Sequence, residues 1–283
     1  MTTRPAHPQW TDDLFPFPTP PALARAVDLA WEADFLATDL YEEGLYDAAR
    51  VQGSAALPFD LCEVPRAPRG WEYTDPWDAT RRPHTPHRSV PELLPFADLG
   101  TGTCVGWAVP APELGRDDHP VAVFGHRTPA VVGRDTRDGL AYLLGLAHPD
   151  DAARLASALG LTTGQRPTGD APIPLDFAPP PGWRHEPCPS GVGLGVLAPA
   201  DAFADTYPTF LGDIDDILTG ASDLLDAGAP ASALLGLTAA YHEDPERLTD
   251  LHPLWARAYD ALDRPFLRAR LEAMAEPPRR TTR

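Results

Sequence analysis

The sequence predicts an α+β fold, with a mixed or antiparallel sheet, flanking helices and a C-terminal all-helical region. Short apolar runs bounded by glycine and proline, which are typical of strands, gather between residues 93 and 132. Amphipathic stretches lie on both sides of them, and after residue 199 apolar residues recur at helical spacing. At 283 residues the chain exceeds a typical domain of about 100–200 residues, so one large or two smaller units are expected.

Prolines divide the chain into segments. The 35 prolines are more than twice the usual share of about 5%, which predicts long connections between compact pieces. We expect a Pro-rich N-terminal strap at residues 1–19 and an α+β domain at 20–165. A Pro- and Gly-rich connector with one extended piece should follow at 166–198, then helical hairpins at 199–276 and a disordered tail at 277–283. Because a lone helical pair cannot bury both its faces, the hairpins should pack against the first domain.

The first helix is predicted to start at Thr19, which can cap it, followed by prolines suited to the first turn. Its apolar residues from Leu23 to Leu36 lie near i, i+4 spacing, with acidic residues off that stripe. An apolar run from Leu57 to Val64 predicts a strand, and residues 65–91 a loop.

A hairpin, an edge strand and a closing helix are predicted next. The hairpin joins Leu93–Asp98 to Val105–Val109 through glycines that tolerate a positive φ. Strands at Val121–Phe124 and Ala130–Val132 follow. Helices are then expected from Asp135 or Thr136 to Leu144, and from Asp150 to Leu161.

The C-terminal part is predicted to hold one strand, Val192 to Leu197, and then four helices. Glycines and prolines set their limits, with Pro230, Pro245, Pro253 and Pro265 at helix starts or breaks. The expected helices are Ile214 to Ala227, Ala231 to Tyr241, Arg247 or Leu251 to Leu262, and Phe266 to Ala275.

Charge and cysteine content restrict the partners and the compartment. The formal net charge is −18, and nucleic-acid binding depends on cations that displace counterions, so no DNA or RNA ligand is expected. A negative surface attracts basic partners, or simply keeps a protein soluble. Three widely spaced cysteines indicate a reducing cytoplasm. No signal peptide and no membrane span of about 18 apolar residues is recognised.

The segment from Leu93 to Leu144 resembles the SUKH superfamily, on the motifs "LLPFAD", a glycine turn, "HPVAVF" and "RDGLAYLL", with "LPFDLCEV" upstream. The resemblance implies a small α+β domain that binds other proteins. For bacterial relatives it implies immunity proteins that neutralise toxin domains, often nucleases, by covering the toxin's active site.

The sequence therefore predicts a non-catalytic protein that binds a basic protein partner, as an anionic mimic can occupy a cationic cleft. The expected contacts are acidic or aromatic side chains of the first helical region and the following loop: Asp34, Asp39, Tyr41, Glu42, Glu43 and Trp77. Two alternatives remain: a regulatory scaffold without a toxin partner, and a small-molecule enzyme that uses the loops bearing His84, His87, His119 and His126. The oligomeric state is left open.

No catalytic residue, metal or cofactor is expected. His84 and His87 have a spacing that a metal could use, but no further ligand completes a tetrahedral set. Residues Gly191 to Gly195 lack the glycine spacing of a dinucleotide-binding motif. They are interpreted as a strand that glycine residues weaken.

Two acidic motifs also have structural interpretations. Asp117, Asp118 and His119 could form an acid–base pair, but a solvated loop is favoured, because catalytic pairs need burial. Further along, Asp213, Asp215 and Asp216 are assigned to a helix N-terminus, where negative charge is stabilised.

Overall fold

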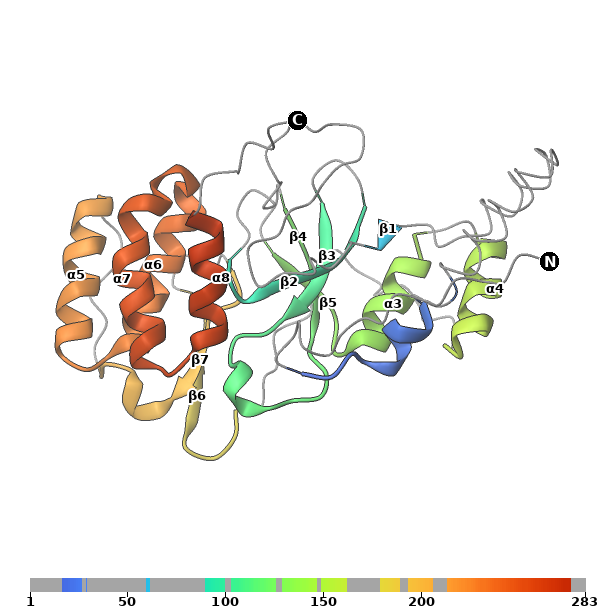
Figure 1. Ribbon diagram of the computed structural model, residues 1–283, viewed down its shortest axis with the longest axis horizontal. Coiled ribbons are helices and arrows are strands. Elements are labelled where there is room, and N and C mark those ends of the chain that lie inside the picture. The colour runs from blue at the N-terminus through green and yellow to red at the C-terminus, as the bar shows by residue number, and fades with distance from the viewer. Residues whose placement is uncertain are drawn as a thin grey trace, which may run out of the picture.

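The fold is described from a computed structural model of the chain. The structure describes residues 17–26, 29, 60–61, 90–99, 103–125, 129–146, 149–161, 179–188, 193–205 and 213–275. A sheet lies in the middle, with helices α3 and α4 on one side and the C-terminal helices α5 to α8 on the other (Figure 1). The predicted α+β class is confirmed, and the helical region packs on the sheet as expected.

The central sheet has five antiparallel strands in the order β1-β2-β3-β4-β5. Their bounds are β1 Asp60–Leu61, β2 Leu93–Asp98, β3 Cys104–Ala108, β4 Val121–Phe124 and β5 Ala130–Gly133. The predicted hairpin is β2–β3, with Leu94 opposite Trp107. The strand that we expected at the edge, β4, pairs on both sides, because the short β5 adds beyond it.

Alternation along the strands gives the sheet two apolar faces. Leu93, Cys104 and Ala122 belong to the core shared with the C-terminal helices. Leu94 and Trp107 point to the opposite core, which α3 and α4 cover. A strand that is buried on both faces needs apolar residues at successive positions, which is why these strands read as continuous apolar runs.

Helices α3 (Thr136–Leu144) and α4 (Pro149–Leu159) follow β5. The Asp135 side chain caps α3 as predicted, accepting a hydrogen bond of 2.9 Å from the backbone N of Asp138. Gly139 brings α3 close to β4, since a Cβ there would lie 2.6 Å from the Val121 side chain. Residues 21–26 are helical, and Arg25 Nε donates to the carbonyl of Ala158 at the end of α4 (2.7 Å).

The C-terminal region contains helices α5 Ile214–Asp226, α6 Pro230–Glu243, α7 Leu248–Ala261 and α8 Pro265–Ala275, with the 3-10 turn η4 Pro245–Arg247 before α7. Prolines start α6, η4 and α8 as predicted. Pro253 neither starts nor breaks a helix, because it lies inside α7. It and Thr249, whose carbonyl loses its intrahelical donor, are both exposed, so water can satisfy that carbonyl.

A second, two-stranded sheet joins β6 (Trp183–Glu186) to β7 (Val196–Pro199). The strand that we predicted at residues 192–197 begins only at Val196. Gly193 and Gly195 have φ values of 90° and 69°, which L side chains rarely adopt. A Cβ on Gly195 would lie 2.3 Å from the carbonyl oxygen of Glu186. These glycines therefore lead into the strand instead of softening it, and that prediction was wrong.

Candidate protein-binding surface

The partner-binding residues predicted from the sequence are not placed by the structure. Asp34, Asp39, Tyr41, Glu42, Glu43 and Trp77 all lie outside the described residues. The same holds for His84, His87 and His126 of the alternative enzyme hypothesis, so only His119 of that group can be located.

Two residues of the segment from Asp117 to His119 are more buried than the solvated loop that we expected: Asp117 is exposed, but Asp118 is partly buried and His119 is buried. The Asp118 carboxylate accepts hydrogen bonds from Thr136 Oγ1 (2.5 Å) and from the backbone N of His119 (2.8 Å). The His119 side chain is 2% exposed and packs on Phe17, with ring centroids 4.4 Å apart. The first turn of α3 has N–H groups that need acceptors, and Asp118 also accepts from the backbone N of Thr136 (3.2 Å), which explains why this loop is drawn inward.

Burial shifts the two titratable groups of this segment in opposite directions. It raises the pKa of Asp118, against the hydrogen bonds from Thr136 and His119, which lower it. Burial, with a smaller contribution from Arg116, lowers the pKa of His119 to about 4. The ring of His119 is therefore neutral at pH 7, and the Asp118 carboxylate bonds the backbone N of His119. We interpret the segment as structural, because it connects the loop to the start of α3.

Acidification should destabilise the protein through His119. Because the folded-state pKa is about 4 and the ordinary value is 6.5, the unfolded chain takes up the proton first as the pH falls. This costs the folded state about 3 kcal/mol between pH 7 and pH 4. The variant His119→Phe keeps an aromatic ring against Phe17 and should lose this part of the pH dependence. Denaturant unfolding of both proteins at the two pH values measures it, and equal pH dependence in both would contradict the assignment.

Exposed carboxylates lie on α5, on η4 and in the first turn of α7. Of the C-terminal helices, α5 lies farthest from the central sheet (Figure 1). We call this set the acidic helical surface: Asp215, Asp216, Asp223, Asp226, Glu246 and Asp250. The apolar residues Ile217, Ala221 and Leu224 anchor the opposite side of α5 in the core. The amphipathic pattern of α5 thus turns its acids outward.

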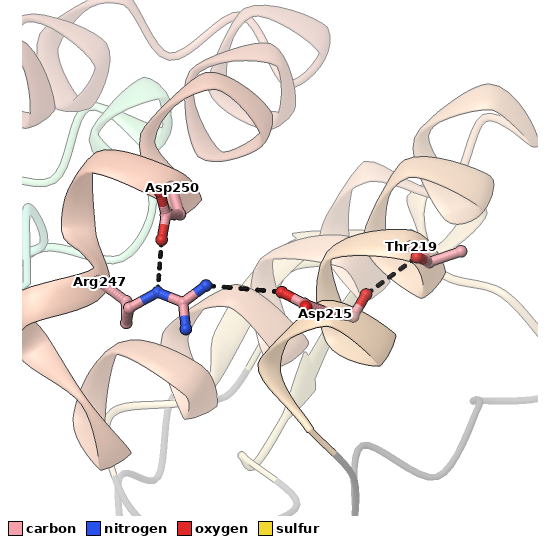
Figure 2. A network of polar contacts seen from close by, with 4 residues as sticks. All are labelled: Asp215, Thr219, Arg247 and Asp250. Atoms are coloured by element: carbon pink, nitrogen blue, oxygen red, sulfur yellow. Dashed lines mark hydrogen bonds and ion pairs between the residues drawn. The ribbon is translucent and has the colours of Figure 1, made fainter.

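Two arginines of the α7 segment form ion pairs with carboxylates of α5. Figure 2 shows Arg247 between Asp250, which accepts from its Nε, and Asp215, which lies 3.5 Å from its Nη2. Further along, Arg257 Nη2 lies 2.8 Å from Asp226 Oδ1. Such solvent-exposed pairs contribute little to stability, so they orient the carboxylates more than they stabilise the fold.

The start of α5 agrees only in part with the helix-terminus interpretation. Asp215 and Asp216 occupy the first turn, where the helix dipole favours negative charge. Asp213 is at the N-cap position, but its side chain accepts no capping hydrogen bond. Capping therefore does not account for this carboxylate.

The described residues contain no group of three or more His, Cys, Asp or Glu side chains arranged to hold a metal ion. Cys104 and Cys188 are both buried. None of the helices that the structure describes is both long enough and apolar enough to cross a membrane. The acidic helical surface is an exposed arrangement of charged side chains that a macromolecule could contact.

Comparison of the chain with protein-family models, curated proteins and solved structures gives no match. The resemblance to the SUKH superfamily therefore stays a prediction. Sequence reasoning missed the acidic helical surface as a candidate site, although its signal was present: Asp216 and Asp223 are seven residues apart, which places them on one helical face.

Proposed function

We propose that this chain is a non-catalytic protein that binds a basic protein partner through the acidic helical surface. The observation that carries the proposal is the excess of exposed carboxylates over available cations. Residues 213–275 contain twelve acidic residues and five arginines. Two of these arginines, Arg264 and Arg270, bond to groups of the sheet side, which leaves the outer face strongly negative.

Charge of one sign on a rigid helical face favours association with a basic protein in two ways. It raises the rate of encounter through long-range attraction, and it disfavours acidic competitors. The acids of α5 are anchored by a packed core, so little ordering is needed on binding. The resemblance to immunity proteins supports a toxin domain, with a nuclease as one candidate, as the partner.

The test is a quantitative pull-down from a lysate of the source cells. The baits are the wild-type chain, the double variant Asp216→Asn/Asp223→Asn, and the matched control Asp201→Asn/Asp205→Asn, whose residues are exposed outside the acidic helical surface. We expect wild type and control to retain one basic protein that the first variant retains at least several-fold less.

Salt gives a second measure with the captured protein once it is purified. Raising the salt from about 0.05 to 0.5 M should slow its association, because screening shortens the field to a few Å. Equal capture by all three baits, or a salt-independent association rate, would overturn binding through this surface. Turnover of a metabolite by the purified chain would overturn the non-catalytic assignment.

A further inference from the structure

Glu92 is an acidic side chain buried between the sheet and the helical region. It precedes β2 and is 7% exposed. Its Oε1 accepts a hydrogen bond of 2.6 Å from the hydroxyl of Tyr259 on α7. Its Oε2 is buried and has no hydrogen-bond partner within the described part of the structure. A buried carboxylate in which one oxygen accepts no hydrogen bond is costly in its ionised form.

The arginines nearest to Glu92 are engaged with other groups. Arg270 of α8 grips the backbone on either side of Glu92, since its Nε donates to the carbonyl of Pro91 (2.6 Å) and its Nη2 to that of Leu93 (2.7 Å). Arg264, in the turn between α7 and α8, pairs with Glu113 at 2.8 Å. Burial raises the pKa of Glu92, and this outweighs the hydrogen bonds from Tyr259 and from the backbone and the charges of Arg264 and Arg270, which lower it.

We propose that Glu92 is a proton-controlled latch for α8: the docked helix favours the protonated carboxyl, and ionisation of Glu92 favours opening of α8 away from β2. Opening would release Arg270 from the two carbonyls and expose Glu92 to water. We assign the motion to α8 because its Arg270 bonds the backbone on both sides of Glu92, and elements of a fold can open locally without global unfolding.

The direction with pH follows from proton linkage. The docked protein holds the Glu92 proton to a higher pH than the opened one, whose carboxyl has the ordinary pKa of 4.5. The opening constant of α8 should therefore rise up to tenfold per pH unit from about pH 4.5 upward, and level off at the docked-state pKa. The other groups facing this cluster are Tyr259, Arg264, Arg270, Glu113 and Asp263. Of these, Glu113 also has a pKa raised by burial, so it needs its own control.

The test is amide hydrogen exchange of the full chain between about pH 4.5 and 8, expressed as protection factors that remove the intrinsic pH dependence of exchange. In the wild type, protection at Leu267 and Leu271 of α8 should fall as the pH rises, while protection at Leu140 and Leu143 of α3 should not follow it. In Glu92→Gln, a neutral isostere, the protection of α8 should be independent of pH. In Glu113→Gln the wild-type dependence should persist.

Infrared difference spectra give a readout independent of opening. We expect a protonated carboxyl band in the wild type that is absent in Glu92→Gln. In the wild type this band should disappear over the same pH range in which the protection of α8 falls. The same pH dependence of α8 in wild type and Glu92→Gln, or an ionised Glu92 throughout the range, would overturn the latch. A failure of the partner pull-down would leave these measurements unaffected.

Discussion

Replacing Arg264 with methionine should lower the free energy of unfolding by about 3–5 kcal/mol, because it removes one partner of a buried ion pair. The Arg264 side chain is 1% exposed. Its Nε lies 2.8 Å from Glu113 Oε1, and its Nη2 donates to the carbonyl of Leu197 on β7 at 2.5 Å. The change would leave a half-buried carboxylate and a buried carbonyl without their donor, which is the costly way to break such a pair.

Denaturant unfolding at pH 7 measures this loss, with Arg257→Met as the matched control. Arg257 also forms an ion pair, with Asp226, but in solvent, so its replacement should change the unfolding free energy by less than about 1 kcal/mol. The double variant Arg264→Met/Glu113→Leu should recover part of the loss, since it removes both charges together. If Arg264→Met is as mild as Arg257→Met, Arg264 does not join the helical region to η2 (Pro112–Leu114) and β7.

The sheet could be predicted because its strands are short apolar runs bounded by glycine and proline. The prediction of Val121–Phe124 matches β4 residue for residue, and Asp135 caps α3 as expected. Local signals were sufficient there, since hairpin and cap chemistry depend on neighbours in the sequence. The C-terminal helices were found for the same reason, within a few residues at their ends.

The contacts between the sheet side and the C-terminal helices could not be predicted, because the contacting residues are distant in the chain. Glu92 and Tyr259 are 167 residues apart, and Arg264 and Glu113 are 151 residues apart. Nothing in the local sequence around Glu92 distinguishes a buried acid from an exposed one at the end of a loop. Sequence reasoning therefore placed Glu92 next to the predicted strand and assigned it no role.

The acidic helical surface was missed for a different reason, although its residues are close together in the sequence. The predicted contact residues belong to the first helical region and the loop after it, whereas the described acidic helical surface lies on α5, η4 and α7. Asp215 and Asp216 were explained by the helix terminus alone, which hid their alignment with Asp223 and Asp226. The amphipathic pattern was visible in sequence, but the neighbouring position of α7 was not, because it depends on how α5, α6 and α7 pack.

Replacing Trp107 with alanine should lower the free energy of unfolding by about 3–5 kcal/mol, because the removed ring lies at the centre of a packed core. Trp107 is fully buried on β3, with ring centroids 5.2 Å from Phe17 and 4.8 Å from Phe96. Its Nε1 also donates to Thr136 Oγ1 at 2.8 Å, which ties the sheet to the first turn of α3. The alanine variant therefore loses stability both from the cavity and from the lost hydrogen bond.

The variant Trp107→Phe separates these two contributions. It keeps an aromatic ring between Phe17 and Phe96 but removes the indole N–H, so it should lose clearly less than the alanine variant. Thr136 keeps its contact to Asp118 in both variants, so the start of α3 should persist. Unfolding free energies from denaturant titration decide between them: a loss in Trp107→Phe equal to that in Trp107→Ala would show that the hydrogen bond, and not the packing of the ring, holds this face of the sheet together.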